Sequence, residues 1–166
     1  KSFLIEKNIS LLSKYNSLLI YGENIGLKDD IKNEIKIFFK ESEYFNFNQD
    51  EIIKNPSLLS EQINNTSLFS KKKIIFINEV SDKIKSHIEE FIQNPNTDIK
   101  IFLRAQTLEK KSSLRKIFEK EKDLGIIACY QDNERTLSEY ISKKLTGYTG
   151  LTQQIINYII NNSGLD

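Results

Sequence analysis

Residues 18–30 are arranged like a nucleotide-binding segment, with an apolar run, a glycine turn and then a helical pattern. A working phosphate-binding loop has the pattern G-x-x-x-x-G-K-[ST]. Its backbone amides hold phosphates, its lysine reaches the terminal phosphates, and its hydroxyl binds magnesium. Here Gly22 and Gly26 are too close together. Lys28 comes one position too late, and Asp29 stands where the hydroxyl should be. The segment therefore predicts the fold of a nucleotide site without its phosphate chemistry.

Carboxylates around this turn also argue against phosphate binding. Glu23, Asp29 and Asp30 lie near the predicted start of a helix. Negative side chains are favourable beside the helix dipole at that end, and they would repel a polyphosphate.

The second half of a nucleotide site is incomplete as well. It requires an apolar strand ending in Asp-Glu, in which the aspartate holds magnesium and the glutamate polarises the attacking water. After the apolar run of residues 74–77 the chain has Asn78 and Glu79. A neutral amide lacks the charge that favours magnesium, so we expect Glu79 to be an ordinary solvent-facing acid. Both losses argue against hydrolysis of a nucleotide.

No other group of residues predicts catalysis or metal binding. His87 is the only histidine and has no ligand spacing around it, which indicates a surface residue. Cys129 is the only cysteine and lies in an apolar run, as an inert core thiol would. Arg104 ends a predicted strand where related ATPases place a polar sensor, and without a phosphate we expect it to be structural. Residues 71–73 are all lysine, and we expect a solvated run, with contact to DNA as the alternative.

The composition favours a globular chain without a strong overall charge. The 166 residues are 39% hydrophobic and include 24 basic and 23 acidic side chains, so no overall positive field points to nucleic acid. The apolar runs are too short to span a membrane and no signal-peptide core is present, so we expect a cytoplasmic location. Because the chain lacks methionine and begins at Lys1, we also expect it to be part of a longer protein.

Apolar runs alternate with helical patterns, which predicts an α/β domain with a mainly parallel five-stranded sheet flanked by helices. In the helix of residues 27–40 we expect Ile31, Ile35, Phe38 and Phe39 to face the core. From residue 133 onward only helical patterns occur, so we place a boundary there. The predicted strands are 17–21, 43–48, 73–78, 99–103 and 125–130, with a short strand at 3–5, and the other predicted helices include 6–14, 55–64, a segment around 84–92, and 112–120.

Leu68 and Phe69 are two adjacent large apolar residues in the polar stretch of residues 64–70, between a predicted helix and a predicted strand. Residue types alone favour their folding back under the loop as part of the core. Alternatively, the pair is exposed and inserts into an apolar pocket of a partner. Burial of two such side chains contributes roughly 3–6 kcal/mol before ordering costs, which is enough for an anchor.

The order of these segments resembles the delta subunit family of the bacterial DNA polymerase III clamp loader. The similarity covers nearly the whole chain. It implies a RecA-like AAA+ module that does not bind ATP, followed by a helical lid and a C-terminal collar domain. Residues 1–133 would be the AAA+ module with its degenerate loop, residues 134–166 would be the beginning of the lid, and the collar would be absent. The segments that carry the resemblance are residues 18–22, 67–69, 73–78, 101–105, 110–114 and 136–145.

This resemblance also implies a function. The family's Ser-Leu-Phe element binds the sliding clamp, inserts its Leu-Phe pair into the clamp's peptide pocket and opens the ring at one interface. The corresponding residues here are Ser67, Leu68 and Phe69. The family motif often begins with glutamine, whereas the aligned position here is Asn64, and Gln62 is out of register.

The implied partners are the sliding clamp (the beta subunit), the delta-prime and tau/gamma subunits through the absent collar, and primed DNA through the assembled complex. Neither a catalytic residue nor a cofactor or metal is implied. ATP would act from neighbouring subunits and change the exposure of the Leu-Phe element. The alternatives are an active P-loop NTPase with an atypical loop, or a nucleic-acid-binding module that uses residues 71–73.

Overall fold

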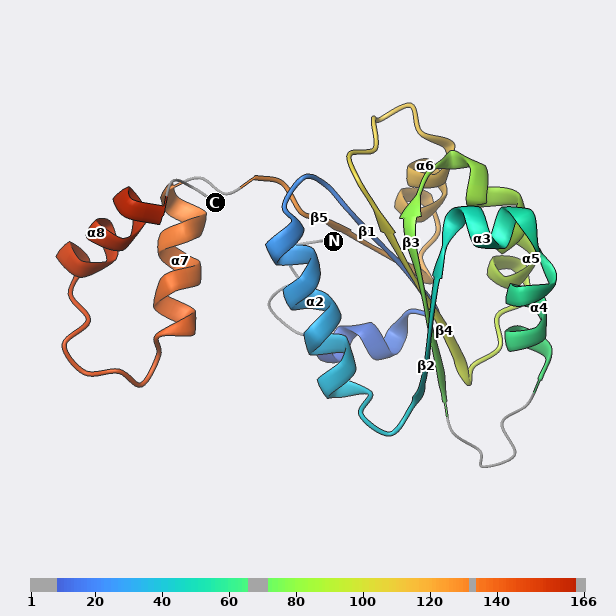
Figure 1. Cartoon of the computed structure of the whole chain (residues 1–166), viewed down its shortest axis with the longest axis horizontal. Helices are drawn as coiled ribbons and strands as arrows, with labels where there is room; N and C mark the ends of the chain where they lie inside the picture. The colour runs from blue at the N-terminus through green and yellow to red at the C-terminus, as the bar shows by residue number, and fades with distance from the viewer. Residues whose placement is uncertain (1–8, 66–71, 132–133, 164–166) are drawn as a thin grey trace. The chain divides into compact units, whose positions relative to one another are not determined.

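The computed structural model describes residues 9–65, 72–131 and 134–163 (Figure 1). Contacts divide the chain into two compact units, Lys1–Cys129 and Tyr130–Asp166, and each is described by itself. The division falls a few residues before the predicted boundary. None of the described helices is long and apolar enough to cross a membrane.

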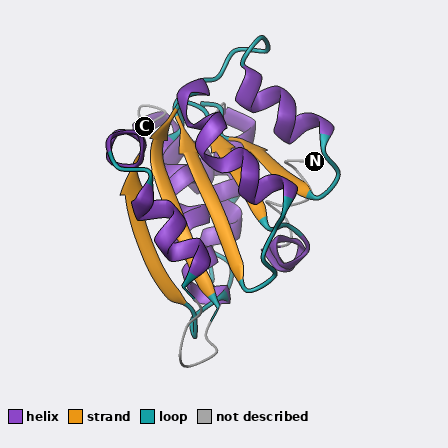
Figure 2. Ribbon diagram, turned by 90° about the vertical axis from the view of Figure 1, so that its right-hand side faces the viewer, coloured by secondary structure: helices purple, strands orange, loops and turns teal. Residues whose placement is uncertain are grey.

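The first unit is built around a five-stranded parallel sheet with the strand order β2-β3-β4-β1-β5 (Figure 2). The prediction of a parallel α/β fold is therefore confirmed. The predicted short strand at residues 3–5 lies outside the described residues. The strands are β1 (Ser17–Tyr21), β2 (Glu43–Asn48), β3 (Lys73–Val80), β4 (Ile99–Ala105) and β5 (Leu124–Ala128).

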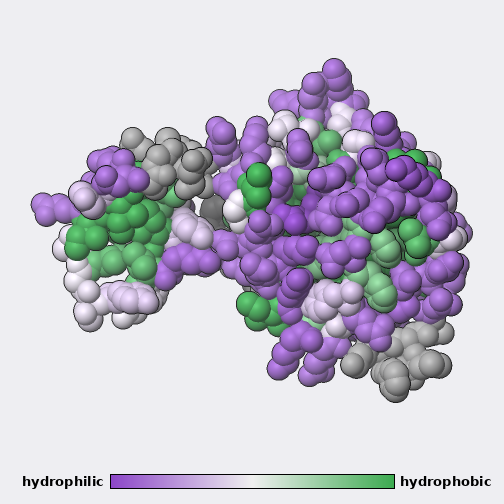
Figure 3. Space-filling view, in the orientation of Figure 1, coloured by the Kyte–Doolittle hydropathy of each residue, from purple (hydrophilic) through white to green (hydrophobic). Residues whose placement is uncertain are grey.

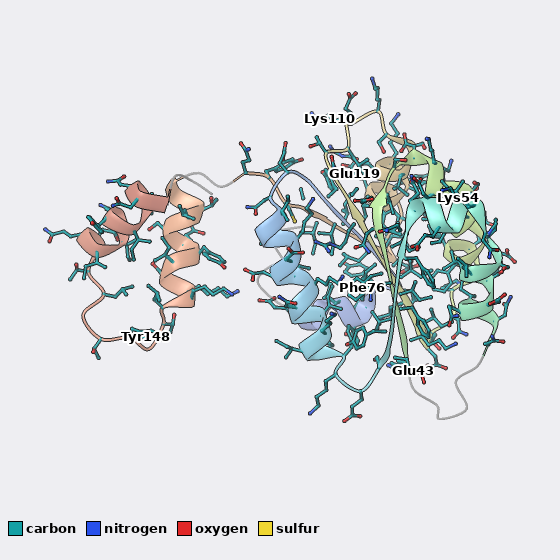
Figure 4. All side chains as sticks on the ribbon, viewed as in Figure 1. Glu43, Lys54, Phe76, Lys110, Glu119 and Tyr148 are labelled. Carbon is teal, nitrogen blue, oxygen red and sulfur yellow. The ribbon has the colours of Figure 1, made fainter. Side chains whose placement is uncertain are left out.

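Helices cover both faces of this sheet, because the central strands are apolar on both sides (Figure 1). One core contains residues of η1 and α2, and the other contains residues of α3, α4, α5 and α6. Phe76, in the middle of β3, is fully buried in the first core (Figure 4). The helical segments are η1 (Ile9–Lys14), α2 (Ile25–Phe38), α3 (Gln49–Lys54), α4 (Ser57–Asn64), η2 (Asp82–Ile84), α5 (Lys85–Gln93) and α6 (Ser113–Lys120).

The structure corrects three local predictions. Helix α3 was not predicted, and Asn55, which was predicted to begin the helix of residues 55–64, ends α3 instead. Asn48 begins α3 through a capping box in which its N–H donates to the Glu51 carboxylate (2.6 Å). Phe38 does not face the core, since it is 41% exposed while Phe39 is buried. The described part of the predicted helix 6–14 is a 3₁₀ helix rather than an α-helix.

Lys100, in β4, is a buried lysine that connects the sheet to η1. Its Nζ donates hydrogen bonds to the carbonyls of Ser13 (3.1 Å) and Tyr15 (2.6 Å). Burial away from water disfavours the ammonium form and lowers the pKa of Lys100 to about 8. The sheet therefore contains a lysine that titrates well below the ordinary range.

We predict that the free energy of unfolding rises between about pH 8 and pH 10. Folded Lys100 loses its proton near pH 8, whereas its ordinary value is 10.5, so the unfolded state binds more protons in this window. The rise is at most about 3 kcal/mol, because one pKa unit corresponds to about 1.4 kcal/mol. Urea unfolding at several pH values measures it. Lys100→Met should flatten the curve, and an equally steep rise in this variant would contradict the assignment.

The second unit contains α7 (Glu134–Lys144) and α8 (Gln153–Ser163). The two helices pack through Leu137 and Ile141 on α7 and through Ile156 and Ile160 on α8. Hydrophobic side chains also gather on the face of this unit that Figure 3 shows. Gly147 and Gly150 in the connection both have positive φ, of 99° and 86°, which glycine adopts readily. The interpretation of this helical pair as the beginning of a lid stays a prediction.

Candidate functional site

The turn after β1 is packed tightly against its neighbours. Gly22 has φ 131°, and its N–H donates to the Gln106 carbonyl (3.2 Å). The N–H of Asn24 donates to the Cys129 carbonyl (3.0 Å). A phosphate-binding loop needs its amides directed at a ligand, whereas these two amides are used within the fold.

Lys28 lies in the first turn of α2 and is buried against the carboxyl ends of two strands. Its Nζ donates to the carbonyls of Gly22 (2.7 Å) and Ala105 (3.1 Å). Burial lowers the pKa of Lys28. In open α/β sheets, ligands bind beyond the carboxyl ends of the strands. Here a side chain of the chain itself occupies that position between β1 and β4.

Arg104, in β4, pairs with the carboxylate of Asp29 in α2. The side chain of Arg104 is largely buried, and its Nε is buried without a hydrogen-bond partner among the described residues. This pair links the sheet to the helix that follows the degenerate loop. Both residues are therefore used in a contact that needs no phosphate.

Of the two candidate magnesium positions, Asn78 makes an internal contact and Glu79 is exposed to solvent. The Asn78 Nδ2 donates to the Phe47 carbonyl of β2 (3.2 Å). Glu79 is exposed and has φ 55°, at a register shift between Ile77 and Val80. Within the described ranges, no group of three or more His, Cys, Asp or Glu residues could hold a metal ion.

Four other residues discussed from the sequence can now be placed. Cys129 is buried, as expected. His87 is partly buried on α5, with its Nδ1 3.3 Å from the Ser86 Oγ. The expectation of a solvated lysine run is wrong for Lys73, which is buried at the start of β3, whereas Lys72 is exposed. Lys71 lies outside the described residues.

Ser67, Leu68 and Phe69 also lie outside the described residues, but both flanks of their segment are described. Helix α4 ends at Asn64 and β3 begins at Lys73. The connection therefore joins the sheet at the amino ends of its parallel strands, whereas the Gly22 turn follows a carboxyl end. Figure 4 shows the two ends of the sheet, with Glu43 at the start of β2 and Lys110 on the loop after β4.

Sequence reasoning missed the contacts of Lys73 at this connection. Its Nζ donates to the carbonyls of Gln62 (3.1 Å) and Asn65 (2.5 Å). The signal was its position directly before the apolar run of residues 74–77, because a strand that is covered on both faces can also bury its first residue. The carbonyl partners could not be predicted from residue types.

Comparisons with known proteins agree on one family. Residues 18–130 match the family model described as DNA polymerase III, delta subunit. A protein of Rickettsia prowazekii, named probable DNA polymerase III subunit delta, is 25% identical over 137 residues, covering 80% of this chain and 40% of that protein. The DNA clamp loader delta protein of Bacillus subtilis shares the fold, with a TM-score of 0.65 and 14% identity over 86% of this chain and 46% of that structure. The chain thus spans less than half the length of either protein.

Proposed function

The chain belongs to the family of DNA polymerase III delta subunits, and from this membership we propose that it is a noncatalytic clamp-loader subunit. In this proposal, Ser67, Leu68 and Phe69 bind the sliding clamp, and the Leu-Phe pair enters an apolar pocket and helps to open the ring. The observation that carries the proposal is the family match, which includes these three residues.

The internal contacts of Lys28 and Arg104 at the degenerate nucleotide site support the noncatalytic part of the proposal. Lys28 donates to two backbone carbonyls where a nucleotide would lie, and Arg104 pairs with Asp29. A bound nucleotide would have to displace the Lys28 ammonium and leave two carbonyls without donors, at a cost of about 1–3 kcal/mol for each. We therefore expect ATP to act on this chain through neighbouring subunits.

The position of the connection supports the clamp-binding part. Residues 66–71 join the sheet at the end opposite the Gly22 turn, so a partner can bind there without contacting the degenerate site. Backbone hydrogen bonds hold both flanks without a ligand. The Asn65 N–H donates to the Glu61 carbonyl (3.0 Å), and the Glu43 N–H donates to the Lys72 carbonyl (2.8 Å).

The other partners are expected to bind the complete subunit rather than the present residues alone. We propose that the complete subunit assembles with the delta-prime and tau/gamma subunits and reaches primed DNA through that complex, in the cytoplasm. The present residues would supply the clamp contact, and regions beyond them would supply assembly.

Clamp binding without nucleotide tests this proposal. Surface plasmon resonance with the cognate clamp should give the same dissociation constant with and without magnesium-ATP, and calorimetry should detect no magnesium-ATP binding. Tight nucleotide binding would favour the NTPase alternative. Absence of clamp binding, together with DNA binding that falls steeply with salt, would favour the nucleic-acid-binding module.

A further inference from the structure

Lys73 joins the two ends of the connection that contains the proposed clamp element. Its Nζ donates to the carbonyls of Gln62 and Asn65 at the end of α4, and Asn65 is 8 residues away in the sequence. Its own N–H donates to the Asp98 carbonyl (2.8 Å) beside β4. One residue thus ties the end of a helix to the start of a strand, on either side of residues 66–71.

The environment of this ammonium is unusual because it is built from backbone and an aromatic ring. The residue is only 6% exposed, and no ion pair is found for it among the described residues. The carbonyls at the end of α4 have no intrahelical donors and carry the negative end of the helix dipole, so they suit a cation. The Phe45 ring of β2 lies 5.7 Å from the Nζ and adds a cation–π contact.

A buried lysine without a carboxylate is a poor way to gain stability alone, because desolvation opposes it. An apolar side chain would fill the same place without that penalty, but it would leave the carbonyls of Gln62 and Asn65 without this donor. The two hydrogen bonds of the ammonium instead fix the position of the end of α4 relative to the start of β3.

We propose that Lys73 is a positioning residue for clamp binding, because its hydrogen bonds hold the end of α4 and the start of β3, which lie on either side of the proposed clamp element, in a fixed relation. This inference rests on the proposed function. A connection with fixed ends loses less conformational freedom when its side chains are immobilised on a partner. Lys73 itself need not contact the clamp.

The test compares Lys73→Met with Lys72→Met in the whole chain. The first variant keeps the apolar stem and removes the donors, and the second removes an exposed charge one residue away. Surface plasmon resonance should show clamp binding weakened about tenfold by Lys73→Met and little changed by Lys72→Met. Hydrogen exchange should show faster exchange of the Asn65 amide in Lys73→Met, with the amides of β1 still protected.

Combination with Leu68→Ala separates positioning from general destabilisation. If Lys73 acts through the connection, Lys73→Met should weaken binding less in the Leu68→Ala background than in the wild type. An equal loss in both backgrounds, or unchanged affinity of Lys73→Met, would overturn this inference and leave the proposed function standing. Failure of the wild-type chain to bind the clamp would overturn both.

Discussion

Replacing Leu68 and Phe69 by alanine together is expected to weaken binding to the sliding clamp by about a hundredfold or more. Burial of two large apolar side chains contributes roughly 3–6 kcal/mol before ordering costs, and each 1.4 kcal/mol corresponds to about a tenfold change in affinity. A few well-buried anchors usually carry most of the free energy of an interface. Titration of the immobilised clamp with wild type and variant measures the difference.

The chain offers a matched control for this experiment. Ile37 and Phe38 are also an adjacent aliphatic and aromatic pair, 74% and 41% exposed at the end of α2. Their double alanine variant should leave clamp affinity within about twofold of wild type. Equal affinity of the Leu68→Ala/Phe69→Ala variant and the wild type would contradict the proposal.

The same variant also distinguishes the two interpretations of the Leu-Phe pair. If the pair formed part of the core, truncation would lower the free energy of unfolding by several kcal/mol, about 2–5 for each side chain. If the pair is an anchor for a partner, urea unfolding should change little while clamp binding is lost. Stability and affinity should therefore be measured on the same preparation.

The sheet could be predicted because its strands have a strong local signal. The apolar run from Ile74 to Ile77 is buried on both faces, and such runs indicate interior parallel strands. Helix α3 was missed because it has only six residues, QDEIIK, and is too short to show a helical period. Its capping residues Asn48 and Glu51 were the available signal.

The nucleotide-binding residues that the candidate site lacks could be predicted from the sequence. The internal contacts that its residues make instead could not. Residue types and spacing were enough to recognise that Lys28 comes one position too late and that Asn78 lacks the charge that a magnesium site needs. They could not indicate that Lys28 donates to Ala105, 77 residues away, or that Lys73 donates to the end of α4. Lysines are almost never fully buried, so a charged residue before an apolar run was expected to be solvated. Carbonyl partners leave no pattern of residue types, because every residue has a carbonyl.

Gly22 is expected to be the most sensitive position of the degenerate loop. A Cβ there would lie 2.0 Å from the Cys129 carbonyl oxygen, and the φ of 131° is one that L side chains rarely adopt. The obstacle is backbone at the end of β5, so the strands would have to separate. We expect Gly22→Ala to lower the free energy of unfolding by about 3 kcal/mol or more, since steric overlap and backbone strain add. Urea unfolding measures the loss.

Gly26 is the natural control, because it is the other glycine of the same loop. It lies in α2, and an added Cβ would meet only the Asn24 Oδ1, at 3.6 Å. Gly26→Ala should leave stability unchanged or raise it by up to about 1 kcal/mol, since alanine favours helix. If Gly22 were a remnant of phosphate binding without a present role, the two variants would be equally stable. A large difference would mean that Gly22 is required by the packing of β1 against β5, so that this glycine of the degenerate loop serves the scaffold.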